Sequence, residues 1–256
     1  MPRYKLTLEY DGTRYAGWQL QKRDRTIQGT CMDACRAVAQ TEHFEFYGAG
    51  RTDAGVHALG QVAHLDMPLD LPPGLLQNQL NDHLPPDISV VMAERAAPRF
   101  HARHHAVARS YVYQFSGSRR AFTKKYVWWL RDMPDLDRMR ELTPLLMGMK
   151  DFRHFTNTKD ESSSTLCQVQ VLDILTQGEL VLLHVVASHF LWKMVRRMTG
   201  LLVAAGRGEI GQQDLLSLFS SPTLTPAAYT APALGLFLER IYYPGDEITP
   251  CRSLFA

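Results

Sequence analysis

The order of elements along the chain predicts an α+β fold, with helices packed on an antiparallel or mixed sheet. Segments with strand periodicity alternate with segments of helical periodicity over the 256 residues. Two apolar strands, 169–175 and 180–187, are separated only by residues 176–179, which is the spacing of a hairpin. No long run of strand–helix–strand crossovers is seen, and this favours α+β over a doubly wound parallel sheet.

The amino-terminal part of the chain contains four strand-like and two helix-like segments. Alternate residues of the first strand place large side chains on one face: Tyr4, Leu6, Leu8 and Tyr10. Thr26 is suited to cap a helix, because apolar residues follow it at helical spacing. We expect strands at 4–10, 44–46, 61–66 and 88–92, and helices at 27–38 and 72–80.

The remainder of the chain begins with its most regular strand. Its alternation puts five residues on one side: Val107, Arg109, Tyr111, Tyr113 and Phe115. The other elements that we expect are helices at 136–146, 190–205 and 215–219, the two hairpin strands, and a last strand at 236–243. No linker rich in proline, glycine or serine divides the chain.

The composition is that of an ordinary globular protein, 45% hydrophobic and 21% charged. No apolar run approaches the ~20 residues of a transmembrane helix, and the start leads into a strand instead of a signal peptide. We therefore expect a cytoplasmic protein without a membrane partner. The four cysteines are too scattered for a disulfide scaffold or a zinc ribbon, and Cys31 and Cys35 share a helix face as core residues.

The net charge of +2 does not by itself identify a nucleic-acid-binding protein, but the cations are clustered. The clusters are Lys22, Arg23 and Arg25; Arg95, Arg99, Arg103 and Arg109; Arg119, Arg120, Lys124 and Lys125; and Arg196 with Arg197. Solvated surface charge is the plainer interpretation. Basic clusters beside aromatic residues are also typical of an RNA-binding surface.

The most informative segment is 48–66, in which the glycines at 48, 50, 55 and 60 bracket one carboxylate, Asp53, with Arg51 two residues before it. A P-loop requires Lys-Ser or Lys-Thr after its last glycine, and a dinucleotide fingerprint requires glycine in place of Asp53. An EF-hand requires several more oxygen ligands. Two interpretations remain: an aspartate that caps a turn, or a preshaped loop that holds Asp53 toward a ligand.

Residues 50–58, Gly-Arg-Thr-Asp-Ala-Gly-Val-His-Ala, resemble the signature of the tRNA pseudouridine synthase A (TruA) family. The resemblance continues over almost the whole chain, in one order. The other matching segments are 10–21, 100–103, 108–113, 190–200 and 235–238.

The resemblance implies a fold and an activity. The fold would consist of two related halves, 1–105 and 106–256, that share a continuous, mainly antiparallel sheet flanked by helices, with the active cleft between them. The activity would be isomerisation of uridine to pseudouridine at positions 38, 39 and 40 in the anticodon stem-loop of tRNA. The family works as a homodimer in which both subunits contact the tRNA. The reaction does not inherently need a metal or a cofactor.

The resemblance also assigns roles to residues. Asp53 matches the essential aspartate and would act as the nucleophile, at C6 of the base or C1′ of the sugar, or as a base toward a sugar proton. A cation such as Arg51 or Arg196 would favour its ionised form. Tyr111 would stack on the base, and Leu236 would line the pocket. Taken alone, Tyr111 and Leu236 are equally typical of core residues, and Arg196 of a helix surface.

Other functions remain open at this point. A hydrolase of the same glycosidic bond generally needs a second carboxylate, and none stands beside Asp53 in the motif. A protein that only binds RNA would account for the basic clusters, although a carboxylate in its cleft would repel phosphate. The histidine run at 101–105 lacks supporting carboxylates or cysteines, so we expect a structural or phosphate-binding role there and no metal.

Overall fold

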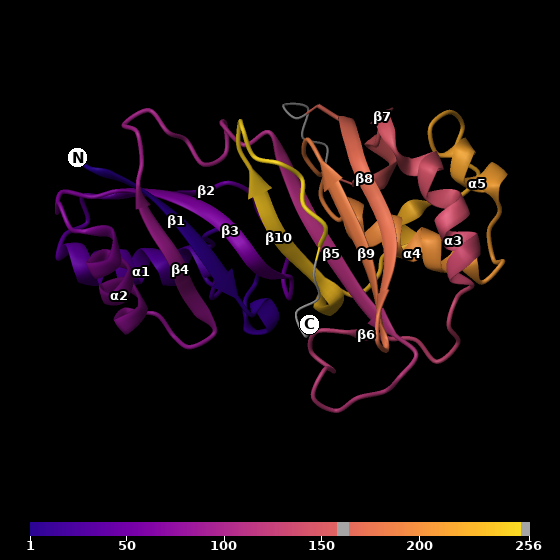
Figure 1. The fold of residues 1–256 in the computed structure, drawn as a ribbon, viewed down its shortest axis with the longest axis horizontal. Coiled ribbons are helices and arrows are strands. Elements are labelled where there is room, and N and C mark those ends of the chain that lie inside the picture. Colours follow the sequence, from indigo (N-terminus) through magenta and orange to yellow (C-terminus); the bar gives the residue numbers. More distant parts are fainter. Residues whose placement is uncertain (158–163, 252–256) are drawn as a thin grey trace. The chain divides into compact units, whose positions relative to one another are not determined.

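The computed structural model describes residues 1–157 and 164–251 and divides the chain into two compact units (Figure 1). The first unit consists of Met1–Val107 and Phe237–Glu247, so the last strand joins the amino-terminal part of the chain. The second unit consists of Ala108–Leu236 and the described residues from Ile248 onward. The predicted halves, 1–105 and 106–256, were assigned from the sequence motifs that each half carries, and they stay a prediction.

The first unit has the strand order β4-β1-β3-β10, and β2 also pairs with β3. Its strands are β1 (Arg3–Tyr10), β2 (Glu45–Gly48), β3 (His57–Asp66), β4 (Ile88–Arg95) and β10 (Leu236–Tyr242). Its helices are the 3-10 turn η1 (Gly12–Arg14), α1 (Ile27–Ala39) and α2 (Pro73–His83). Only the β3–β10 pair is parallel; the other pairs in this part of the described chain are antiparallel.

The second unit has the strand order β5-β9-β8-β7, and β6 pairs with β5. Its strands are β5 (Ala108–Ser116), β6 (Trp128–Trp129), β7 (Gly148–Asp151), β8 (Leu166–Gln177) and β9 (Leu180–Ala187). Its α-helices are α3 (Leu136–Leu142), α4 (Met194–Gly206) and α5 (Gln212–Ser217). Its 3-10 turns are η2 (Thr143–Leu146), η3 (Arg153–Phe155), η4 (Pro226–Tyr229) and η5 (Ala233–Gly235).

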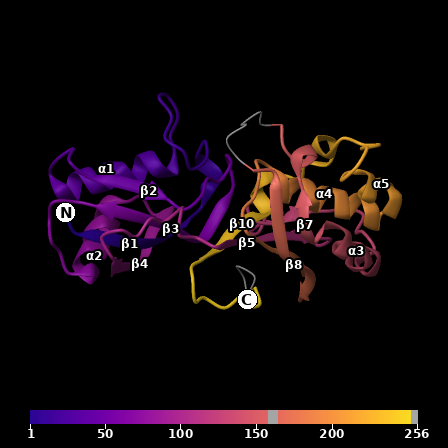
Figure 2. The same cartoon turned by 90° about the horizontal axis from the view of Figure 1, so that it is seen from above.

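Both units combine a mainly antiparallel sheet with helices, so the predicted α+β class is confirmed. In the first unit α1 packs on α2, and in the second α3 packs on α4, as can be followed from above in Figure 2. The predicted face of β1 is fully buried, and Thr26 caps α1 by accepting a hydrogen bond from the Gly29 amide at 3.2 Å. The hairpin of β8 and β9 also forms as predicted.

Two predicted helices have different limits in the structure. The helix expected at 190–205 begins only at Met194, because Lys193 adopts a left-handed backbone with φ of 60° and breaks the helical path. The helix expected at 136–146 is α-helical only to Leu142 and continues as the 3-10 turn η2, which has Pro144 in its first turn. Proline has no amide hydrogen to donate into a longer α-helix.

The other differences have three separate causes. β3 begins at His57 instead of residue 61, because its first residues pair with β10, Phe237 opposite His57 and Leu238 opposite Ala58. The helix expected at 215–219 lies at 212–217 instead, after a turn in which Asp214 accepts a hydrogen bond from the Gly211 amide at 2.8 Å. The short strands β6 and β7 carry too few residues for a periodic signal.

A buried histidine, His64, makes the first unit sensitive to acid. Its side chain is 2% exposed, stacks on Tyr47 and lies 4.6 Å from the ring of His101. Its Nδ1 accepts a hydrogen bond from the Ala102 amide at 3.2 Å. Burial, followed by the charges of His101 and Arg3, lowers the pKa of His64 from 6.5 to about 4.

We predict that stability falls as the pH drops below about 6.5, because the unfolded chain then binds a proton at His64 that the folded protein does not. Between pH 7 and 5.5 this histidine accounts for a loss of up to about 1 kcal/mol in the free energy of unfolding. Urea unfolding at the two pH values measures it. His64→Gln should show a smaller loss than wild type, and His43→Gln, at an exposed position, should match wild type. An unchanged loss in His64→Gln would contradict the assignment.

Candidate active site

The loop between β2 and β3, residues 49–56, carries Arg51 and Asp53. Its side chains differ sharply in exposure: Thr52 and Val56 are buried, Asp53 is half-buried, and Arg51 is exposed. In the described residues, Arg51 makes no hydrogen bond or ion pair. The loop therefore packs one side into the first unit and presents a cation two residues before a partly sheltered carboxylate.

Hydrogen bonds fix this loop at both ends and in its middle. At its start, the Ala49 amide donates to Val62 O at 2.7 Å, and Gln61 Nε2 donates to Gly50 O at 3.1 Å. In the middle, the Trp18 amide donates to Thr52 O at 3.0 Å. At its end, the Val56 amide donates to Asp53 O at 3.1 Å. These contacts hold the backbone on either side of Asp53.

The segment that follows β1 lies directly against the loop. The Tyr10 hydroxyl is 2.9 Å from Thr52 Oγ1, in a buried hydrogen bond. Gly17 has φ of +100°, and a Cβ built there would lie 2.6 Å from Thr52 O and 3.1 Å from Asp53 C. A Cβ on Gly12 would overlap Val56 O. Glycine is thus required at both positions by close backbone approach, and at Gly17 also by its conformation.

His57, the residue at which the loop enters β3, belongs to the same packing although the sequence did not single it out. Its ring is 1% exposed and stacks on Phe237 of β10, with ring centroids 4.7 Å apart. The Gly12 amide donates to its Nδ1 at 3.1 Å. Histidine next to a glycine-rich loop carries no specific sequence signal, so only the three-dimensional contacts identify this role.

In the second unit, Tyr111 lies on β5 opposite Val185 of β9. The side chain is only 9% exposed, and its ring meets Phe190 edge to face, with centroids 5.1 Å apart and planes at 84°. Phe190, one of the non-helical residues before α4, thus sets the orientation of the Tyr111 ring.

Arg196 lies in the first turn of α4 and is held by the segment after η4. Its Nε donates to Ala231 O at 2.7 Å, and the Ala231 amide donates back to Arg196 O at 3.0 Å. A Cβ on Gly200, one turn further along α4, would overlap Tyr229 O, so the segment lies very close to the helix. Burial raises the pKa of nearby Tyr113, and the charge of Arg196 acts in the opposite direction.

The predicted residues fall into two groups. Arg51 and Asp53 share one loop of the first unit, whereas Tyr111, Arg196 and Leu236 lie in the second, on β5, α4 and the first position of β10. Leu236 is 5% exposed, which agrees equally with a core residue and with a residue lining a pocket. Joint action of the five on one substrate stays a prediction.

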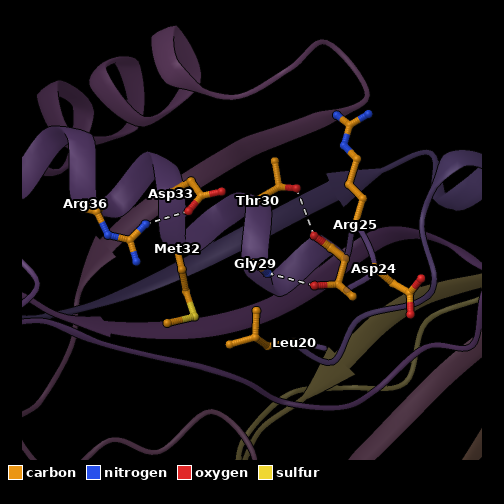
Figure 3. Close-up of a pocket in the computed structure, with 9 residues that line it drawn as sticks. Leu20, Asp24, Arg25, Gly29, Thr30, Met32, Asp33 and Arg36 are labelled. Carbon is orange, nitrogen blue, oxygen red and sulfur yellow. Dashed lines mark hydrogen bonds and ion pairs between the residues drawn. The ribbon is translucent and has the colours of Figure 1, made fainter. Parts of the chain in front are cut away.

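One hollow in the first unit lies apart from these residues. It measures about 210 Å³ and borders the start of α1 (Figure 3); its lining consists of Leu20, Asp24, Arg25, Thr26, Gly29, Thr30, Met32, Asp33 and Arg36. Arg36 pairs with Asp33 and Glu42, and Arg25 donates to the Tyr15 hydroxyl at 3.0 Å. Its cations are thus engaged by protein groups, and no predicted site residue lines it.

Two properties of the described residues, 1–157 and 164–251, concern metals and membranes. No group of three or more His, Cys, Asp or Glu side chains is arranged to hold a metal ion. No helix in these ranges has both the length and the apolar composition needed to cross a membrane.

We predict that Gly17→Ala destabilises the protein by about 1–3 kcal/mol, because the added methyl group meets the backbone of the Asp53 loop in a strained conformation. The control, Gly50→Ala, lies in the same loop with nothing within 4 Å of its Cβ, and its free energy of unfolding should be within about 0.5 kcal/mol of wild type. Urea unfolding compares the two. Equal stability of both variants would contradict the close approach at Gly17.

Comparison with known proteins places the chain in a family. A family model described as "tRNA pseudouridine synthase" matches residues 7–105 and 143–244. Proteins named tRNA pseudouridine synthase A are similar to it: one from Rhodopseudomonas palustris (strain BisA53) is 41% identical and one from Thermodesulfovibrio yellowstonii 35%, each covering 95% of this chain and 100% of its own length. One from Agrobacterium fabrum is 36% identical, over 98% and 96% respectively. With the Asp53 loop inside the first matched segment, the chain belongs to the tRNA pseudouridine synthase family.

Proposed function

We propose that this protein isomerises uridine to pseudouridine at positions 38, 39 and 40 in the anticodon stem-loop of tRNA, with Asp53 as the nucleophile. Membership of the tRNA pseudouridine synthase family supports the reaction. The observation that carries the assignment to Asp53 is the loop itself. The loop holds one half-buried carboxylate next to an exposed guanidinium. Its backbone is fixed by hydrogen bonds and by close-packed glycines.

The reaction exchanges one bond for another within a single nucleotide. The bond between C1′ and N1 breaks, the uracil turns, and C1′ joins C5. C5 loses its proton and N1, which has no hydrogen in uridine, gains one, so that atoms and electrons balance without an external donor. The protein must therefore supply a nucleophile, hold the detached base and keep water away. No metal or cofactor is required for any of these steps.

Asp53 suits the first task because its loop is set before the substrate arrives. A nucleophile held by a rigid backbone loses little entropy on reaching the reacting geometry. Arg51, exposed on the same loop, would contact the phosphate next to the target uridine. Attack at C6, attack at C1′ and removal of a sugar proton all use the same carboxylate.

The second task, holding the base, we assign to the residues of the second unit. Tyr111 would stack on the uracil with its ring braced by Phe190. Arg196, oriented by its contact with Ala231, would pair with Asp53 and with charge on the detached base, and Leu236 would provide an apolar wall. A uridine in the stem must leave its stack to reach these groups, at a cost of a few kcal/mol that such contacts offset.

We further propose that the protein works in the cytoplasm as a homodimer in which both subunits contact one tRNA. The resemblance of the chain to tRNA pseudouridine synthases supports this assembly. Sedimentation at micromolar protein concentration tests it, with the mass of two chains as the expected result.

The direct test uses an unmodified tRNA transcript that carries tritium at C5 of its uridines. We expect wild type to release tritium without added metal or cofactor, and Asp53→Ala and Asp53→Asn to reduce the rate by at least about 10⁴-fold, because the nucleophile is gone. Digestion of the product should yield pseudouridine, lost when uridines 38–40 are replaced by cytidine.

Each other outcome identifies a different function. Free uracil in the digest would indicate a glycosidic hydrolase. Tight tRNA binding without tritium release in wild type would indicate a protein that only binds RNA. Full activity in Asp53→Asn would show that the carboxylate is not the nucleophile.

A further inference from the structure

The connection between β5 and β6, residues 117–127, carries the most exposed of the large hydrophobic side chains in the described residues. Phe122 is 97% exposed (Figure 1 shows the loop extending beyond the sheet beside β6). Cations flank it on both sides in sequence: Arg119 and Arg120 before it, and Lys124 and Lys125 after it. A single exposed hydrophobic residue is common on protein surfaces, so Phe122 gains significance only from the cations around it and from a second exposed aromatic residue.

The loop is anchored to its own unit, so the exposure of Phe122 does not result from detachment. Arg120 pairs with Glu179 of the β8–β9 turn through two hydrogen bonds of 2.9 and 2.7 Å. After Phe122, the Tyr126 amide donates to Thr123 O at 2.8 Å, and Gln114 Nε2 donates to Tyr126 O at 3.1 Å. Because Arg120 neutralises Glu179, that carboxylate does not cancel the charge of the lysines.

A second exposed aromatic residue lies at the base of the same loop. Trp129 of β6 is 38% exposed and lies near two guanidinium groups, Arg119 at 5.3 Å and Arg131 at 6.0 Å from its ring. Its Nε1 donates to Gly117 O at 3.1 Å, which ties it to the base of the loop. The basic–aromatic surface, as we call it, consists of Arg119, Phe122, Lys124, Lys125, Trp129 and Arg131.

We propose that the basic–aromatic surface binds the tRNA away from the target uridine, with an unpaired base on Phe122 and the flanking phosphates on Lys124 and Lys125. This inference rests on the proposed function, since it takes tRNA as the partner. Aromatic side chains beside cations match the chemistry of single-stranded RNA, whose bases stack while its phosphates are neutralised.

Charge favours RNA over a second copy of this chain as the occupant. If Phe122 lay on the two-fold axis of a symmetric dimer, the cations around it would meet the same cations of the partner. Like charges placed opposite one another weaken such a contact. A polyanion has the complementary charge.

The test measures the Kd for full-length tRNA by filter binding at several salt concentrations. Phe122→Leu keeps the apolar volume but loses the aromatic face, and we expect it to weaken binding about fivefold or more. Phe122→Tyr should bind like wild type. Lys124→Ala/Lys125→Ala should reduce the slope of log K against log salt by about 1 to 2, and Lys124→Arg/Lys125→Arg should keep it. Unfolding midpoints check that each variant is folded.

The outcomes separate this proposal from the function on which it rests. Tritium release by Phe122→Leu at saturating tRNA, at the wild-type rate, would agree with a contact remote from the chemistry. Wild-type affinity and salt slope in all variants would overturn the surface while leaving the isomerase intact. Unchanged tRNA affinity with altered sedimentation of Phe122→Leu would identify a contact between copies instead. Failure of wild type to bind tRNA would overturn both.

Discussion

The structure of the site depends on a contact between two backbones that leaves no room for a Cβ atom. The segment after β1 approaches the Asp53 loop so closely at Gly12 and Gly17 that any larger residue would overlap Val56 O or Thr52 O. A hydrogen bond from the Trp18 amide to Thr52 O and another between Tyr10 and Thr52 close the same contact. Two stretches some forty residues apart in sequence therefore form one rigid unit around the carboxylate.

This close approach explains how the loop has a fixed backbone and still leaves Asp53 partly exposed. The backbone on each side of Asp53 is fixed by hydrogen bonds to β3 and to the segment after β1, and the Thr52 side chain adds a buried hydrogen bond to Tyr10. Arg51 is consequently left exposed, and Asp53 half-buried. We propose that a carboxylate held in this way is preorganised for attack, which is more demanding than the capping role that a lone aspartate in a loop usually has.

The sequence was sufficient to predict the structural features that depend on neighbouring residues. The alternation of β1, the Thr26 cap of α1 and the hairpin of β8 and β9 all follow from neighbouring residues and are confirmed. Asp53 was singled out among its glycines, but its role came only from the family resemblance and stays a prediction. The start of α4 was not, because the left-handed Lys193 and the packing of Phe190 on Tyr111 depend on residues far away in the chain. The partner of Arg196, Ala231, is likewise distant and carries no side-chain signal.

The central claim, that the Asp53 loop is formed before RNA binds, is tested most directly by hydrogen exchange in the free protein. The amides of Trp18 and Val56 report on it, since both donate to loop carbonyls. We predict that both exchange slowly without RNA and change little when tRNA is added. Rapid exchange of both amides in the free protein, with protection only after tRNA is added, would show that the substrate forms the loop and would contradict the account.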